Sequence, residues 1–73
     1  MAADTFQIAF VTRNGNTFHY GYDHFPYLTK EIAKARKLDC NFYTTKASRK
    51  EEAERLKKYF FGNDCEITAL VLE

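Results

Sequence analysis

Aromatic side chains recur at every second position of residues 18–22, and this alternation restricts the fold more than any other feature of the chain. The rings belong to Phe18, Tyr20 and Tyr22. A period of two residues is typical of a β-strand, whose side chains point alternately to opposite faces. Aromatic side chains bury more area per residue than most others, so we predict that these rings form the core of the domain.

This strand is predicted to pair with a preceding strand, Thr5 to Thr12, through a hairpin. Arg13-Asn14-Gly15-Asn16 is a turn signal, because Asn and Gly tolerate positive φ angles. We predict a three-residue loop, Arg13 to Gly15, with Gly15 left-handed, since a slip of one residue would scatter the apolar side chains over both faces. The predicted register pairs Phe10 with Phe18, Ile8 with Tyr20, and Phe6 with Tyr22.

Two segments after the hairpin are predicted to be a helix and a strand. Over residues 25–37, apolar side chains recur at helical spacing, and Pro26 is tolerated in a first helical turn. Residues 39–46 return to an alternating pattern, which indicates a strand. Asp23 or His24 is expected to cap the first helix.

A second helix and a final strand complete the prediction. Ser48 and Glu51 have the spacing of a capping box, and Gly62 is expected to end the helix in the left-handed conformation. The buried stripe of the helix is predicted to be Ala53, Leu56 and Phe60. Residues 65–72 are apolar on both faces, which favours a central strand.

The predicted fold is therefore a single small α+β domain over residues 1–73, with the order β-β-α-β-α-β. Right-handed crossovers would place both helices on one face of a four-stranded mixed sheet. In this arrangement the last three strands run parallel, and the final strand lies beside the first.

Composition narrows the classes of function. The chain has 73 residues with 45% hydrophobic and 29% charged side chains, which is ordinary for a globular domain. A net charge of +1 gives no strong overall attraction to nucleic acid or to an anionic membrane, and no apolar run is long enough to span a bilayer. The two cysteines are too few for a disulfide framework, so we expect free thiols in the cytoplasm.

Enzymatic and metal chemistry are not favoured. The predicted topology places Asp23 and His24 at the end of the sheet opposite Cys40 and Cys65, too far apart to share a zinc ion. No nucleophile is placed beside the Asp23-His24 pair. We predict a non-enzymatic protein without a cofactor.

A basic turn before the second helix is a candidate anion site. Backbone N–H groups at a helix N-terminus favour negative charge, and cations gather at this turn. A phosphate group or a nucleic acid is the corresponding ligand, although an ordinary solvated turn has the same composition. The candidate residues are Lys46, Ser48, Arg49 and Lys50.

The leading hypothesis is a small regulatory protein that binds another protein, or a second copy of itself, through the open sheet face or an edge strand. Its basis is the apolar content on both faces of the last strand, in a chain too short to cover both. An imidazole in the middle of that face is expected to be exposed and to meet the partner. The candidate partner-binding residues are Val11, Thr17, His19 and Tyr43.

Overall fold

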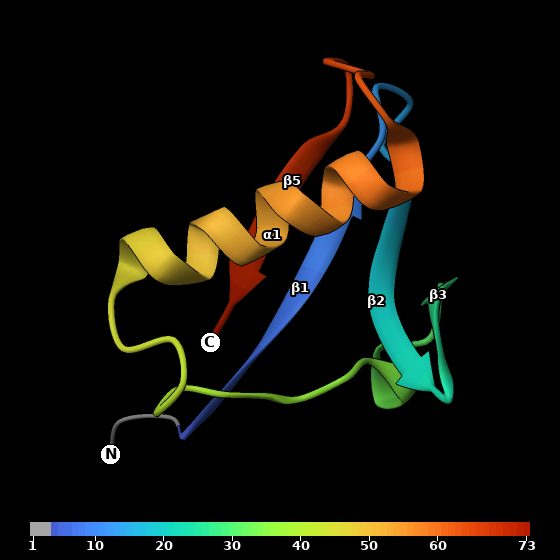
Figure 1. The fold of residues 1–73 in the computed structure, drawn as a ribbon. Helices are drawn as coiled ribbons and strands as arrows, with labels where there is room; N and C mark the ends of the chain where they lie inside the picture. Colours follow the sequence, from blue (N-terminus) through green and yellow to red (C-terminus); the bar gives the residue numbers. More distant parts are fainter. Residues whose placement is uncertain (1–3) are drawn as a thin grey trace.

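The computed structural model describes residues 4–73, which form five strands, a 3-10 turn and one α-helix (Figure 1). The strands and helices are β1 (Thr5–Val11), β2 (Thr17–Asp23), β3 (Phe25–Thr29), η1 (Ile32–Lys34), β4 (Leu38–Asp39), α1 (Lys46–Phe61) and β5 (Thr68–Leu72).

The strands form an antiparallel sheet in which β1 is central. The order along the sheet is β3-β2-β1-β4, and β5 also pairs with β1. All four strand pairings are antiparallel. The prediction that the last strand lies beside the first is confirmed, whereas the predicted mixed sheet with parallel strands is wrong.

The hairpin prediction is confirmed in its loop, and its register is confirmed only beside the loop, where Phe10 pairs with Phe18. The predicted pair of Phe6 with Tyr22 is wrong, and Tyr22, expected in the core, pairs with Pro26 and is 47% exposed. The Gly15 N–H donates to the Thr12 carbonyl at 3.0 Å, and Gly15 has a φ of 84°. A residue with a side chain would be strained in this conformation, which explains the glycine at this position.

Beyond this turn the two strands of the hairpin diverge, and Figure 1 shows β1 and β2 spreading apart toward the N-terminal end of β1. The segment 36–39 bonds to both strands there. The Arg36 N–H donates to the Tyr20 carbonyl of β2 at 2.8 Å, while β4 pairs with β1 through Phe6 and Leu38. The inserted segment thus pairs backbone groups that the divergence would otherwise leave unbonded.

The core lies between α1 and the sheet. Phe6, Ile8 and Phe10 are the largest fully buried side chains, and Ala53 and Leu56 bury the inner face of α1 against them. Tyr20 and Phe60 belong to the same cluster. The predicted buried stripe of the helix is therefore confirmed, with Phe60 only partly buried.

The boundaries of α1 differ from the prediction at one end. Thr45 is the N-cap, and its side chain accepts a hydrogen bond from the Ser48 N–H at 3.0 Å. The Ser48 hydroxyl accepts in return from the Thr45 N–H at 3.2 Å. The capping box therefore joins Thr45 and Ser48, not Ser48 and Glu51. At the other end Gly62, with a φ of 64°, ends the helix as predicted.

The predicted helix over residues 25–37 is wrong. The chain turns sharply at His24, which has a φ of 65° in place of a capping role, and returns as β3 along β2. Pairing with β2 satisfies the backbone of this segment, and Pro26 is compatible with an outer strand. Only the single turn η1 is helical, and Ile32, expected in the core, is 58% exposed.

The predicted strand over residues 39–46 is also wrong. Only Leu38 and Asp39 pair with β1, and the chain then turns toward the N-cap of α1. One helix therefore covers the sheet where two were predicted. The last strand, expected in the centre, is an outer strand beside β1.

Candidate functional site

An outer edge of the sheet lies along β5. Within residues 4–73, β5 pairs with β1 and with no other strand. Its five residues, Thr68-Ala69-Leu70-Val71-Leu72, contain no charge and no proline. Charges and proline are the usual devices that prevent another strand from pairing with a sheet edge. The sequence of β5 itself therefore does not block pairing.

The backbone groups that β5 presents at this edge follow from the register. The Thr12 N–H donates to Asn16 across the hairpin turn at 2.9 Å, so the even-numbered residues of β1 direct their backbone groups toward β2. The odd-numbered residues of β1 face β5, where they pair with Thr68, Leu70 and Leu72. It follows that the N–H and C=O groups of Ala69 and Val71 point away from β1, to the outer edge.

A groove of about 430 Å³ runs between this edge and the start of α1. Figure 1 shows the first turns of α1 extending past β5 on the side away from β1. The lining residues are Lys46, Arg49, Lys50, Ala69, Leu70, Val71 and Glu73. We call this space the β5–α1 groove.

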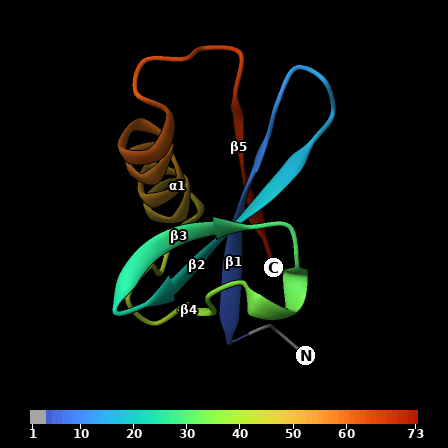
Figure 2. The ribbon, with the colours of Figure 1, turned by 90° about the vertical axis from the view of Figure 1, so that its right-hand side faces the viewer.

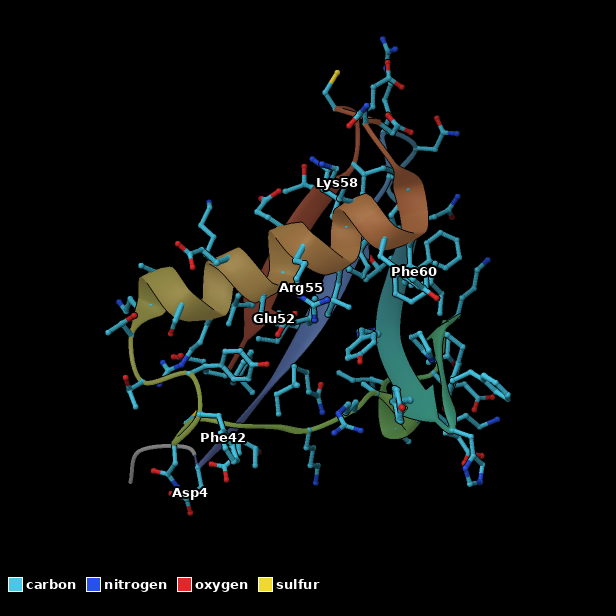
Figure 3. The ribbon with its side chains drawn as sticks, in the orientation of Figure 1. Asp4, Phe42, Glu52, Arg55, Lys58 and Phe60 are labelled. Atoms are coloured by element: carbon cyan, nitrogen blue, oxygen red, sulfur yellow. The ribbon has the colours of Figure 1, made fainter. Side chains whose placement is uncertain are left out.

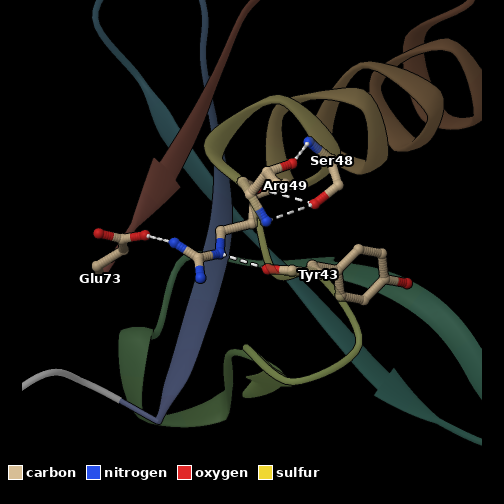
Figure 4. Close-up of polar contacts among 5 residues, drawn as sticks. Tyr43, Ser48, Arg49 and Glu73 are labelled. Carbon is tan, nitrogen blue, oxygen red and sulfur yellow. Dashed lines mark hydrogen bonds and ion pairs between the residues drawn. The ribbon is translucent and has the colours of Figure 1, made fainter.

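Arg49 connects the two walls of the β5–α1 groove (Figure 4). Its Nε donates to the Tyr43 carbonyl at 2.7 Å, and its Nη1 forms an ion pair with the Glu73 carboxylate. The guanidinium also lies 5.7 Å from the centre of the Phe6 ring. The side chain is only 16% exposed. Arg49 therefore holds the end of β5 against the start of α1.

Of the four residues predicted to bind an anion, two are engaged within the protein. The Ser48 hydroxyl is used in the helix cap, and Arg49 is paired with Glu73. Lys46 and Lys50 are exposed and line the groove. They lie four residues apart, so they share one side of α1, on which Lys57 also falls. The cations that the groove offers to a ligand are thus Lys46 and Lys50.

The four residues predicted to bind a partner do not lie together. Val11 and Thr17 are paired at the hairpin end of the sheet, with Thr17 exposed. His19, expected to be prominent, is buried with 8% exposure. Tyr43 is not on a strand and packs on the other side of the sheet, with its ring 5.5 Å from that of Phe6.

The burial of His19 follows from the unexpected path of residues 25–37. Figure 2 shows η1 on the side of the sheet opposite α1. On that side His19 pairs with Ala9 and Thr29, and the Tyr27 ring lies over Gly21. The face predicted to be open is therefore partly covered by the chain itself.

Tyr43 lies on the flank of α1 opposite the groove. Its hydroxyl donates to the Glu52 carboxylate, which also pairs with Arg55; Figure 3 shows Glu52 and Arg55 close together. The hydrogen bond to Glu52, together with burial, raises the pKa of Tyr43 above the usual 10.0. Burial is the main cause that raises the pKa of Tyr20. These groups are neutral near pH 7 and stabilise the fold.

Residues of the kinds used in metal and acid–base chemistry are scattered. Asp23 and His24 are both highly exposed, with 3.7 Å between the imidazole Nε2 and a carboxylate oxygen. Cys40 and Cys65 are free thiols. Among residues 4–73, no three His, Cys, Asp or Glu side chains are grouped to hold a metal ion. The predicted placement is wrong for Cys40, whose N–H donates to the Asp4 carbonyl at the start of β1, the end of the sheet at which β2 reaches Asp23. Cys65 precedes β5 at the other end.

No protein-family model matches the chain, and comparisons with curated proteins and with solved structures found no match. In the described part of the chain, none of the helices combines the length and the apolar character needed to cross a membrane.

Sequence reasoning identified part of the β5–α1 groove. The lysines were predicted as a basic surface at the start of a helix, and the last strand was singled out for its apolar faces. The missing member is Glu73, which pairs with Arg49 across 24 residues of sequence. The absence of charge between Glu66 and Glu73 is the signal that could have indicated an outer edge suited to pairing.

Proposed function

We propose that this protein is a non-enzymatic binding module that accepts an extended segment of a partner protein along the outer edge of β5. The single observation behind the proposal is an unblocked edge strand beside a groove that leads under the first turns of α1. Strand addition to a sheet edge is a common mode of peptide recognition, in which backbone hydrogen bonds supply affinity and side-chain contacts supply specificity.

The groove suits an added strand better than a small ligand. Neighbouring strands lie about 4.8 Å apart, so an added strand would run directly along Ala69 and Val71. Their outward N–H and C=O groups would be its partners. Leu70, which is 38% exposed on the face away from α1, would gain an apolar neighbour. Regulation by capture of a partner segment follows from this mode of binding.

Phosphate or nucleic-acid binding at the start of α1 is the alternative from the sequence, and the geometry supports it less. Two of its four predicted side chains, Ser48 and Arg49, already have partners within the chain. Strand addition depends on backbone hydrogen bonds, whereas a phosphate site depends on charge. Methylation of peptide nitrogens, which removes N–H donors and leaves the charge unchanged, therefore separates the two proposals.

A reducing compartment, with the cytoplasm as the expected one, is also part of the proposal. Its support is that Cys40 and Cys65 are both free, with Cys65 exposed.

The test is a titration of the protein with short extended peptides, followed by amide chemical shifts. We expect the shifts to be largest for residues 68–72 and for the first turns of α1, with β3 as the internal control. Methylating the peptide nitrogens at one set of alternate residues should abolish binding, and methylating the other set should not, because only one set of N–H groups faces β5.

A variant of the protein tests the same backbone hydrogen bonds by removing a donor from β5. Ala69→Pro removes an outward N–H at a position where an edge strand tolerates proline, so binding should fall while the fold is retained. The N-methylated peptides decide the matter if this variant fails to fold. Equal binding of both methylated peptides would overturn strand addition.

A further inference from the structure

The outer edge of β5 raises the question of which strand it accepts, and the candidates are a second copy of this chain and a segment of another protein. The answer depends on what already lies above the place of the added strand. The first turns of α1 extend over that place (Figure 1), and Lys46 and Lys50 line it.

A second copy fits this space poorly. Two β5 strands related by a two-fold axis would pair antiparallel, and the axis would stand perpendicular to the sheet. Both copies of α1 would then lie on the same face. Each β5 carries its own helix, since α1 packs against β5 and Ala69 and Val71 join the core beneath it. The first turns of one α1 would therefore meet the helix that covers the partner's β5.

Charge also disfavours the second copy. Lys46 and Lys50 lie on one side of α1 and line the groove, whereas Lys57 on the same side is paired with Glu54. In the symmetric pair Lys46 and Lys50 of both copies would bring positive charge to the same interface. Like charges placed opposite one another oppose association. The occupant is thus a strand that brings no helix of its own and carries negative charge.

The alternation of an added strand defines the sequence that it needs. Residues opposite Ala69 and Val71 would face α1, and their neighbours would lie beside Leu70 and Leu72 on the other face. Carboxylates on the α1-facing side of the added strand would therefore lie beneath the first turns of α1, where Lys46 and Lys50 line the groove.

We propose that the β5–α1 groove binds an acidic extended segment of a partner protein, in which acidic residues facing α1 alternate with apolar residues facing the other way. This inference rests on the proposed strand addition and adds the chemistry of the partner. Lys46 and Lys50 supply the charge selection, and the exposed side of Leu70 supplies the apolar contact.

The experiment compares three peptides of equal length in which valine alternates with glutamate, glutamine or lysine, titrated at low and at high salt. We expect the glutamate peptide to bind about fivefold more tightly than the glutamine peptide at low salt, with the lysine peptide weakest, since two partly exposed ion pairs each contribute modestly. Salt should reduce this difference. A glutamate–valine peptide of the same composition but in two blocks should bind more weakly than the alternating one.

Charge reversal of the protein is the matched test. In the double variant Lys46→Glu and Lys50→Glu, the order of the glutamate and lysine peptides should invert. Negative charge in the first turns of a helix is favourable, so this variant should fold. The control variant carries Lys37→Glu and Lys58→Glu, two exposed lysines outside the groove, and should keep the preference of the natural protein.

The outcomes separate the two proposals. If the glutamine and glutamate peptides bind equally and charge reversal changes nothing, the acidic partner is wrong and strand addition stands. If no peptide binds, strand addition itself is wrong, and the lysines serve to guard the edge against pairing. Displacement of the glutamate peptide by inorganic phosphate, with full binding by both N-methylated peptides, would identify an anion site and overturn both. A concentration-dependent dimer through β5, seen by sedimentation, would replace the acidic segment with a second copy.

Discussion

The two outer strands of the sheet, β3 and β5, have the same length, but only β5 can offer every outward backbone group to an additional strand. Each pairs with a single neighbour within residues 4–73. β3 contains Pro26, which cannot donate a backbone hydrogen bond, whereas β5 contains only residues that can. Proline fits a paired strand only where its nitrogen faces away from the neighbour, so β3 lacks a donor at its outer edge.

The surroundings of the two strands differ as well. After β3 the chain folds back through η1, on the side of the sheet opposite α1 (Figure 2). Beside β5 the sheet is bordered by the β5–α1 groove, held in shape by Arg49 and Glu73. Natural proteins protect sheet edges that have no partner. The contrast between a blocked edge and an unblocked one of equal length is the reason that binding is proposed at β5.

The largest expected loss of stability concerns Tyr20, whose ring packs beneath the β3 side of the sheet. Tyr20 is buried in the core and pairs with Leu28 of β3. Tyr20→Ala should lower the free energy of unfolding by about 3–5 kcal/mol, as for other large-to-small changes of buried rings. Val71→Ala on the β5 side, at a partly buried position, should lower it by about 1–2 kcal/mol, since two methyl groups are lost. Urea denaturation of both variants measures the difference, and a smaller effect for Tyr20→Ala would show that the β3 side does not depend on this ring.

Much of the β1–β2 hairpin and of α1 was predictable because several local signals agree there. Gly15 supplies the positive φ of the loop, and the alternating rings select the register. In α1 the apolar stripe and the terminal Gly62 give the same answer. The cap alone was misplaced, since Ser48 can act as an N-cap or as the N3 residue of a box that begins at Thr45.

Residues 24–45 were not predictable because their local signals conflict. Phe25, Leu28 and Ile32 have helical spacing, while Phe25, Tyr27 and Thr29 alternate as in a strand. The deciding interaction is pairing with β2, after a corner at His24 for which the sequence gives no glycine. The burial of His19 depends on this same corner, so its predicted exposure failed together with the predicted helix.

The burial of His19 gives the second prediction, which tests whether the β3 side of the sheet is covered. His19 is buried, and its Nδ1 has no hydrogen-bond partner among the described residues. His19→Ala should lower the free energy of unfolding by about 1–3 kcal/mol, because packing is lost. The matched control is Thr17→Ala on the same strand, at an exposed position, with a change within about 0.5 kcal/mol. If the thermal melts of the two variants coincide, His19 is exposed to solvent and the β3 side of the sheet is not covered.

The third prediction opens the blocked edge. Pro26→Val restores an N–H to the outer side of β3, and we expect the variant to associate with itself as its concentration rises. Its stability should change by less than about 1 kcal/mol, mainly through the unfolded state. Sedimentation velocity measures the association, with Phe25→Val, at an exposed position of the same strand, as the control that adds a β-branched residue without adding a donor. A strict monomer would mean that Pro26 is not what protects β3, and the comparison with β5 would lose its physical basis.

The last prediction concerns Tyr43, which separates the groove from the opposite flank of α1. Its carbonyl holds Arg49, while its hydroxyl donates to Glu52. Tyr43→Phe removes only the second contact, so we expect a loss of about 0.5–1.5 kcal/mol in unfolding free energy and unchanged peptide binding.

The pH dependence of stability follows from the same hydrogen bond, because the folded-state pKa of Tyr43 is raised above the usual 10.0. The contribution of such a group is fully present below pH 10.0 and is lost as the pH rises through the folded-state pKa. Burial raises the pKa of Tyr20 as well, so Tyr20 adds a loss of stability of the same sign.

Stability should therefore be level on approaching pH 10.0 and fall above it, less steeply in Tyr43→Phe than in the natural protein. Tyrosinate absorbance, followed with urea melts at each pH, measures both quantities. Equal slopes in the two proteins would show that the Tyr43–Glu52 contact is absent in solution, while weaker peptide binding by Tyr43→Phe would show that the flank and the β5–α1 groove are coupled through Arg49.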